Sequence, residues 1–257
     1  MCGVDQWQKK VGAAPITASL IAAVVVIYLL QLLLAALGRP LDISDWSLSR
    51  NGLLQGSWWS LFTHLFLHGS FLHLFANVLA LWFVGPEVEM LLGRAKFLLL
   101  YFASGLAGGL LQIAFAPPMS ELIGSSGAVC GVLLSFTTAY PNLPLRALLF
   151  FILPVRMKAK TLGRGLIVFS LLCALLKILP QIGHLAHLGG ALTGAALTWG
   201  WLRQTKQTYL MARDGQPKTS TDALLERVLK EGMDGLSPSE RQQLENLTKK
   251  DGRRRRW

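Results

Sequence analysis

Residues 16–37 form an unbroken run of 22 residues without a charge, and this run constrains the fold more than any other feature of the sequence. A helix rises about 1.5 Å per residue, so the run would extend for roughly 33 Å, enough to cross the hydrocarbon core of a bilayer. A secretory signal peptide is the alternative, because Lys9 and Lys10 precede the run. Signal peptides have shorter apolar regions of about 7–15 residues, and no clean cleavage site follows Leu37. We therefore predict a membrane-spanning helix.

Further apolar segments indicate that the whole chain is an all-α membrane protein. The composition is 52% hydrophobic and only 15% charged, which does not fit an ordinary soluble domain. A run at residues 147–155 is too short to cross, so we interpret it as interfacial or as an extension of the preceding span. Together with residues 16–37, five segments give a prediction of six spans: 71–84, 97–116, 123–140, 165–179 and 183–202.

The net charge of +11 has a topological explanation. With six spans both termini lie on one side, and that side receives nine Lys and Arg residues even without the C-terminal tail, against two or three on the other side. The positive-inside rule then places both termini in the cytoplasm, as in a bacterial plasma membrane. A nucleic-acid partner is not needed to explain the charge.

Three regions follow from this topology. Residues 1–15 form a cytoplasmic N-terminal segment, residues 16–202 the six-helix membrane domain, and residues 203–257 a basic cytoplasmic tail. In the tail, Ser237-Pro238-Ser239-Glu240 is typical of a helix capping box, and residues 223–229 favour a preceding helix. Arginines at 253–256 are suited to contact with anionic lipid, although a solvated or disordered end fits the same composition.

Polar residues in the second predicted span share one helix face. His73 and Asn77 are four residues apart and lie in the outer half of that span. His64 and His68 precede them near its outer end. Polar groups inside membrane spans are costly, so such residues point to function.

The fourth and sixth predicted spans also begin outside. Ser126 lies about one helical turn into the fourth, and His184 and His187 lie at a similar depth in the sixth. Topology alone therefore brings a serine, several histidines and an asparagine to one level of the outer leaflet.

A serine and a histidine at one level suggest a nucleophile and a general base for acyl transfer. No acidic residue lies within a predicted span on the outer side, so we expect a dyad rather than a triad. The N–H of Ser126, the Asn77 amide and the His73 ring are candidate donors to an oxyanion. Taken singly, each residue has a simpler explanation, because serine and asparagine often only connect membrane helices.

No metal site or thiolate chemistry is predicted. His64 and His68 have the i, i+4 spacing of two metal ligands, but the sequence lacks the HExxH of a zinc protease. Three cysteines form no CxxC pair, so we expect neither a structural disulfide nor a thiolate zinc site. No cofactor is required for the dyad.

Glycines predict close approach of the helices that carry the dyad. Gly127 and Gly131 are four residues apart in the fourth span, and Gly190 and Gly194 are four apart in the sixth. Such small-xxx-small pairs let two backbones meet. We expect this contact to bring Ser126 and His187 within hydrogen-bonding reach.

Two motifs around these residues resemble those of the rhomboid family of intramembrane serine proteases. Gly124-Ser125-Ser126-Gly127 is similar to the family's GxSG, whose serine is the nucleophile. Ala186-His187-Leu188-Gly189-Gly190, followed by Gly194, resembles its AHxxGxxxG, which makes His187 the base.

The second span strengthens the resemblance, which covers about residues 57–201. His64, His68, His73 and Asn77 resemble the family's HxxxH and HxxxN patterns, in which the last two positions belong to the oxyanion hole. Gly85, Glu89 and Gly93 resemble the GxxxExxxG that closes that helix. Two positions depart from the family: Ser60 follows Trp59 where arginine is frequent, and His184 stands where asparagine is frequent.

The resemblance implies a six-helix rhomboid-like bundle with a re-entrant first loop around residues 42–63 and substrate entry beside the fifth helix. It implies an endopeptidase whose partners are the lipid bilayer and membrane proteins with transmembrane segments. Two rivals remain at this point. A non-catalytic rhomboid-like protein that binds membrane clients usually lacks the serine or the histidine, and a solute carrier would show inverted internal repeats.

Overall fold

The computed structural model describes residues 14–149, 153–179, 181–214, 228 and 236–242. The chain divides into two compact units, Met1–Leu202 and Arg203–Trp257. The longer elements are α2 (Pro15–Ala36), α5 (Phe71–Leu92), α6 (Arg94–Phe115), α7 (Ser126–Ala139), α8 (Ala159–Leu175) and α9 (His184–Asp214). The shorter elements are η1 (Ile43–Asp45), α3 (Arg50–Leu54), α4 (Ser60–Thr63), η2 (His64–Phe66), β1 (Pro144–Leu149) and β2 (Leu153–Lys158).

Within the part of the chain that the structure describes, three helices, α2, α5 and α6, have the length and apolar composition needed to cross a membrane. Each has 22 residues, and α7 is a shorter apolar helix of 14 residues. On α2 the side chains of Val26, Leu29 and Leu33 are more than half exposed, as expected of a helix surrounded by lipid. The predicted helical membrane protein is therefore confirmed, whereas the count of six spans and the re-entrant loop stay predictions.

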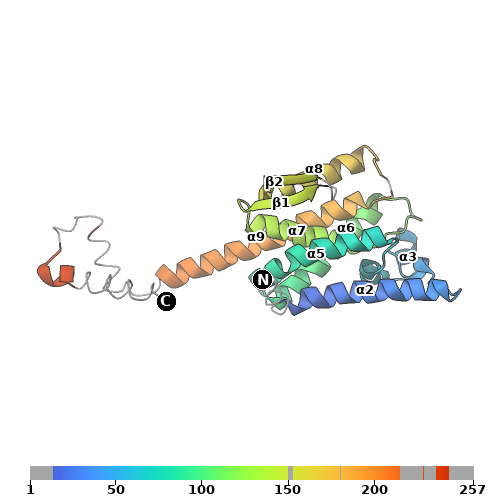
Figure 1. The fold of residues 1–257 in the computed structure, drawn as a ribbon, viewed down its shortest axis with the longest axis horizontal. Helices are drawn as coiled ribbons and strands as arrows, with labels where there is room; N and C mark the ends of the chain where they lie inside the picture. The colour runs from blue at the N-terminus through green and yellow to red at the C-terminus, as the bar shows by residue number, and fades with distance from the viewer. Residues whose placement is uncertain (1–13, 150–152, 180, 215–227, 229–235, 243–257) are drawn as a thin grey trace. The chain divides into compact units, whose positions relative to one another are not determined.

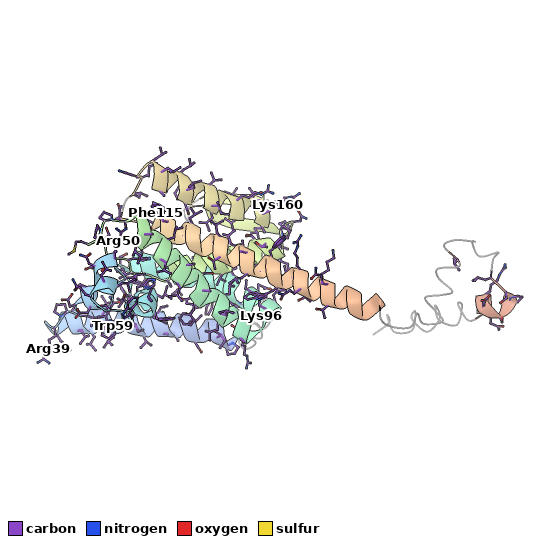
Figure 2. The ribbon with its side chains drawn as sticks, turned by 180° about the vertical axis from the view of Figure 1, so that it is seen from behind. Arg39, Arg50, Trp59, Lys96, Phe115 and Lys160 are labelled. Atoms are coloured by element: carbon purple, nitrogen blue, oxygen red, sulfur yellow. The ribbon has the colours of Figure 1, made fainter. Side chains whose placement is uncertain are left out.

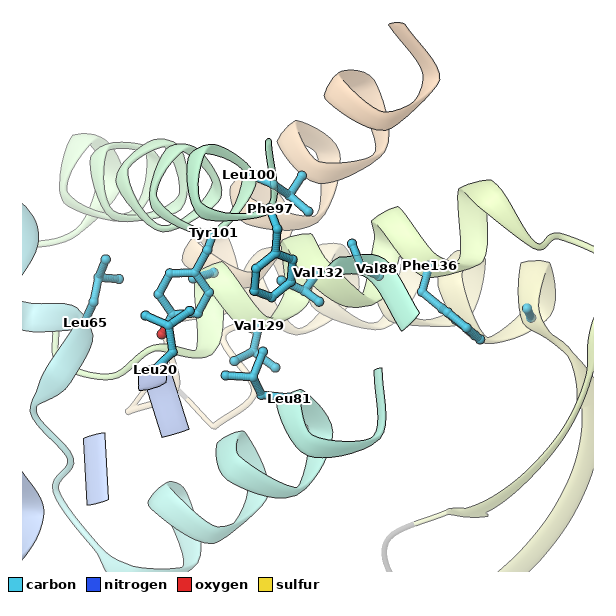
Figure 3. Packing of buried hydrophobic residues seen from close by; sticks show 12 residues of the cluster. Leu20, Leu65, Leu81, Val88, Phe97, Leu100, Tyr101, Val129, Val132 and Phe136 are labelled. Carbon is cyan, nitrogen blue, oxygen red and sulfur yellow. The ribbon is translucent and has the colours of Figure 1, made fainter. Parts of the chain in front are cut away.

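The first unit is a helical bundle with one shared core. Figure 1 shows α2 and α8 on opposite sides of this bundle, with α7 and α9 between them. The core combines side chains of α2, α5, α6 and α7, among them Leu20, Leu81, Phe97, Tyr101 and Val132 (Figure 3). Phe97, Tyr101 and Val132 are fully buried.

The segment between α7 and α8 differs from the prediction. Residues 147–155 are not a helical extension of the fourth span, because β1 and β2 pair as an antiparallel hairpin. Proline at both Pro144 and Pro154 disfavours helix, and β-branched and long apolar residues fit a strand. The interfacial position of this segment stays a prediction.

The C-terminal unit is described only in part. At its capping box, Ser237 Oγ and the Ser237 N–H each lie 2.8 Å from a Glu240 carboxylate oxygen, and the Glu240 N–H lies 3.4 Å from Ser237 Oγ. A helix follows from Pro238, so this part of the prediction is confirmed. The helix predicted at residues 223–229 lies outside the described residues except for Val228. Helix α9 continues to Asp214, beyond the predicted end of the sixth span at Leu202.

The first loop is fastened to the end of α6 by Arg50. Its guanidinium donates to the carbonyls of Ile113 (2.8 Å), Ala114 (2.6 Å) and Ala116 (3.3 Å). These carbonyls end a helix and lack intrahelical partners, so a cation is favourable there. Figure 2 shows Arg50 beside Phe115 at this end of the bundle. Arg50 therefore anchors the loop although Ser60 replaces the arginine that is frequent in the family.

Glu89 fastens α2 to α5. Its carboxylate accepts hydrogen bonds from the N–H of Ile16 (3.0 Å), the N–H of Thr17 (2.7 Å) and Thr17 Oγ1 (2.8 Å). Glu89 is buried, and the negative charge lies against the first turn of α2, where the helix dipole favours it. The four-residue spacing of Gly85 and Glu89 thus has a structural explanation, since Gly85 leaves room for Thr17.

We expect Glu89→Leu to destabilise the bundle strongly. It would leave three donors unpaired, the two on Thr17 being buried, at a cost of about 1–3 kcal/mol for each buried unpaired group. Glu89→Gln keeps one acceptor oxygen, so its free energy of unfolding should fall between those of Glu89→Leu and the parent. Denaturant titration in mild detergent measures this order. Equal stability of the parent and Glu89→Leu would contradict the assigned role of the carboxylate.

Candidate active site

Ser126 and His187 meet across the bundle. Ser126 is the first residue of α7, and His187 lies in the first turn of α9. His187 Nε2 is 2.8 Å from Ser126 Oγ, which is hydrogen-bonding distance. Both residues are partly buried. This pair has the arrangement of a nucleophilic hydroxyl next to a general base.

The contact depends on direct approach of two helix backbones. A Cβ placed on Gly190 would overlap the Gly127 carbonyl oxygen, and a Cβ on Gly194 would overlap the Gly131 carbonyl oxygen. Any side chain at either position would push α9 away from α7. The predicted close approach of these glycines is therefore confirmed.

A sharp turn delivers the chain to Ser126. Gly124 has φ +113°, a conformation that side chains rarely allow, and a Cβ there would lie 2.6 Å from His73 Nε2. The Gly124 N–H donates to the carbonyl of His64 (2.8 Å). Leu48 and Leu122 pair as a short β-bridge just before the turn. The first loop and the loop that precedes α7 are thus held together next to Ser126.

The candidate oxyanion donors lie on two helices. The N–H of Ser126 belongs to the first turn of α7, where N–H groups lack intrahelical acceptors. His73 packs against Gly124, two residues from Ser126. The Asn77 amide donates to the carbonyl of His73 (3.0 Å), one turn earlier on the same face of α5. The structure therefore brings His73 to the serine turn and ties Asn77 to His73.

His64 and His68 have separate partners. His64 Nδ1 is 2.7 Å from the Ser60 carbonyl oxygen, and His68 Nε2 is 3.4 Å from Ser125 Oγ. The rings of His68 and His73 are 5.0 Å apart between centroids. Both histidines support the loop and the turn around Ser126 rather than pointing at one common position.

His184 connects the first turn of α9 to the preceding loop. Its Nε2 is 3.0 Å from the Ile178 carbonyl oxygen, and its ring centroid is 6.1 Å from that of His187. A histidine therefore makes a hydrogen bond to the backbone at the position where asparagine is frequent in the family.

The acidic residues near this end of the bundle do not offer a buried third member. Asp42, Asp45 and Glu121 are all exposed. The Asp42 carboxylate accepts from Ser44 Oγ (2.6 Å) and the Ser44 N–H (3.1 Å), and these hydrogen bonds lower the pKa of Asp42. Asp42 caps η1, which is a local structural function.

Gln112 is a residue that the sequence reasoning missed. Its Oε1 accepts from the N–H groups of Leu185 (3.1 Å) and Ala186 (3.2 Å), in the first turn of α9 immediately before His187. These N–H groups have no acceptor within the helix. An uncharged polar residue inside the apolar third span was the available signal, because such residues usually bind another helix.

Comparisons with known proteins find rhomboid relatives of this chain. The chain is 35% identical to rhomboid protease GluP of Bacillus subtilis over 144 residues, covering 55% of this chain and 26% of GluP. It is 33% identical to RHOMBOID-like protein 1 of Arabidopsis thaliana over 162 residues, covering 61% and 38%. It is 26% identical to rhomboid protease GlpG of Salmonella paratyphi A over 197 residues, covering 73% and 63%.

In each case the chain spans less than two thirds of the relative's own length. The family model of the Rhomboid domain matches residues 55–204, which is more than half of the chain and includes every candidate site residue. From this match and the relatives, we conclude that the chain belongs to the rhomboid family.

Proposed function

We propose that this protein is an intramembrane serine endopeptidase that cleaves transmembrane segments of membrane proteins through Ser126 and His187. The observation that carries the proposal is the 2.8 Å contact between His187 Nε2 and Ser126 Oγ at the start of two apposed helices. The family supports it, because rhomboid relatives are named as proteases.

In the acylation step, Ser126 Oγ attacks the carbonyl carbon of a client peptide bond and His187 Nε2 accepts the hydroxyl proton. Negative charge develops on the carbonyl oxygen. The Ser126 N–H, the His73 ring and the Asn77 amide stabilise it. His187 then donates its proton to the leaving amine, which leaves an acyl-enzyme on Ser126.

In the deacylation step, water attacks the ester and His187 acts again as the base. Ser126 regains its proton when the tetrahedral intermediate collapses. No step requires a charged third residue, because His184, Gln112 and the helix contacts fix the position of α9 and with it His187.

The membrane side of the reaction follows from the charges. Figure 2 shows Lys96 and Lys160 at one end of the bundle and Arg39, Arg50 and Trp59 at the other. Arg94, Lys158 and Arg164 are close in the sequence to Lys96 or Lys160. Ser126 begins α7, and the opposite end of α7 is the one near Lys160, whose N–H donates to the Pro141 carbonyl. We place the basic end in the cytoplasm and the dyad near the outer face, as in a bacterial plasma membrane.

Labelling with a fluorophosphonate probe tests the proposal directly. We expect the purified chain to react once per molecule, with the adduct on Ser126 by mass spectrometry, since an activated serine is required for this reaction. Ser126→Ala should show no labelling. An unlabelled parent protein, folded by gel filtration and thermal melting, would instead favour a non-catalytic member that binds membrane clients.

We expect Gln112→Leu to impair turnover by loosening the first turn of α9. Two N–H groups next to His187 lose their acceptor, and a small displacement of a catalytic base lowers turnover by about 10-fold to 100-fold. Gln112→Glu retains an acceptor and should recover most of the loss. Because Gln112 acts through α9 and touches no substrate, kcat should fall while KM stays nearly unchanged.

Gln55→Leu is the matched control for Gln112→Leu, because Gln55 is exposed on the first loop. It should leave kcat and KM at the parent values. A Gln112→Leu enzyme with unchanged kcat, or one changed only in KM, would rule out the positioning role.

A further inference from the structure

The hairpin between α7 and α8 has basic residues on both of its strands. Its register pairs Arg146 on β1 with Arg156 on β2, and Lys158 lies two residues further along β2. Directly opposite residues share a face of an antiparallel pair, as do residues two apart on one strand. On β2, Arg156 and Lys158 therefore lie on one face of the hairpin.

The two faces of β2 differ in burial. Val155 and Met157 are partly buried, whereas Arg156 and Lys158, which alternate with them, are exposed. Leu145, on the same face as Met157 by register, packs against the hydrophobic core. The apolar face of β2 therefore lies toward the hydrophobic core, and the face with Arg156 and Lys158 is exposed.

Helix α8 extends the basic surface. Lys160 and Arg164 are four residues apart on its first turns, and no acidic residue lies there. Cations at a helix N-terminus oppose the helix dipole. Backbone hydrogen bonds from Ala159 to Leu143 (2.9 Å) and from Lys160 to Pro141 (3.0 Å) hold α8 to the base of the hairpin. These five cations share one short segment: Arg146, Arg156, Lys158, Lys160 and Arg164.

No acidic residue close in the sequence supplies a counter-charge for this segment. The sequence contains no Asp or Glu between Glu121 and Asp214. Among the residues that the structure describes, none forms an ion pair with Arg156, Lys158, Lys160 or Arg164. An external anion would relieve the repulsion among the neighbouring cations of β2 and α8 and their unfavourable position at the helix start.

The position of the segment identifies that anion. The hairpin lies at the end of α7 remote from Ser126, where α8 begins. Further along α8, Val168, Phe169 and Leu172 are about half exposed (55%, 49% and 49%), as expected of side chains that contact acyl chains. The basic segment thus lies where a lipid-facing helix reaches the headgroup region.

We propose that the basic face of the hairpin and the start of α8 form a binding site for the headgroups of anionic phospholipids. Clusters of four to eight Lys and Arg residues beside a spanning helix bind such headgroups. A lipid satisfies both features of the site, because its phosphate meets the cations and its acyl chains meet the apolar face of α8. A free phosphate ion would satisfy only the first. The proposal does not depend on proteolysis.

Lipid retention by the full chain in detergent tests this site. Native mass spectrometry would count phosphatidylglycerol and phosphatidylcholine bound at equal lipid concentrations. We expect a clear preference for phosphatidylglycerol in the parent. Each cation near an anionic surface contributes about fivefold to binding, so Arg156→Glu/Lys158→Glu should weaken phosphatidylglycerol binding by about 25-fold or more. Arg156→Gln/Lys158→Gln should also weaken phosphatidylglycerol binding. It replaces Arg156→Glu/Lys158→Glu as the test if that charge-reversed variant does not fold.

Arg94→Glu/Lys206→Glu is the control, because it changes the net charge equally at two exposed cations outside the segment. It should keep nearly the parent preference. Equal losses in the control and the hairpin variants would show that the charges act only through net charge and topology, which overturns the proposal. Full displacement of the lipid by millimolar inorganic phosphate at constant ionic strength would overturn it as well, since the site would then be one for a free anion.

Discussion

Ser126→Ala is expected to abolish cleavage of a fluorogenic transmembrane substrate in detergent or liposomes. Removing the nucleophile of a serine protease lowers kcat by a factor of about 10⁴ or more, because the remaining groups bind and polarise the substrate without attacking it. Folding should be largely unaffected, since the variant loses one hydrogen bond between α7 and α9 while the backbone contacts at Gly190 and Gly194 remain. The measurement is the initial rate of cleavage over a range of enzyme concentrations.

Ser125→Ala is the matched control, because it removes the same hydroxyl one residue earlier. Ser125 is buried against His68 at 3.4 Å, so we expect a loss of activity within about tenfold. Ser126→Ala/His187→Ala should be no slower than either single variant, since the two residues act as one unit. Parent-level cleavage by Ser126→Ala, or abolition by Ser125→Ala, would place the nucleophile elsewhere.

Much of the site could be predicted from the sequence because membrane topology is nearly one-dimensional. Once the spans are placed, the depth of each residue follows from its position in the run, and the fourth and sixth spans put Ser126 and His187 at one level. The glycine pairs then indicate which helices touch. The contact at 2.8 Å and the packing of Gly190 on Gly127 follow this reasoning closely.

The features that the sequence does not predict are long-range hydrogen bonds from side chains to backbone groups. Gln112 binds a helix start 73 residues away, and Arg50 binds a helix end 63 residues away. Neither contact produces a recognisable residue pattern in the sequence, because one partner of each hydrogen bond is a backbone group that every residue carries. Such partners depend on how helices are placed laterally, which depth alone does not determine.

The hairpin was missed for a different reason. A short apolar run of strand length cannot be distinguished from a buried helical segment by periodicity alone. Pairing of β1 with β2 involves residues on either side of a turn, and the alternation of Val155, Arg156, Met157 and Lys158 becomes meaningful only with the register known.

Gly190→Ala is expected to destabilise the bundle strongly, because the new Cβ would overlap the backbone oxygen of Gly127. Backbone cannot rotate away as a side chain can, so α9 must shift. Overpacking of this kind costs about 1–3 kcal/mol and occasionally more. Since a shift of about 1 Å at a catalytic base lowers turnover about 100-fold, fluorophosphonate labelling of Ser126 should slow by a similar factor.

Gly200→Ala on the same helix provides the control, because a Cβ at Gly200 meets no atom within 4 Å. The identical chemical change should there raise the free energy of unfolding by about 0.5–1 kcal/mol, since alanine restricts the unfolded chain and favours helix. Opposite signs for one substitution on one helix isolate the backbone contact from helix propensity. Denaturant titration and labelling rates of both variants measure the two effects, and a Gly190→Ala protein as stable and as reactive as Gly200→Ala would show that α7 and α9 do not meet at Gly127 and Gly190.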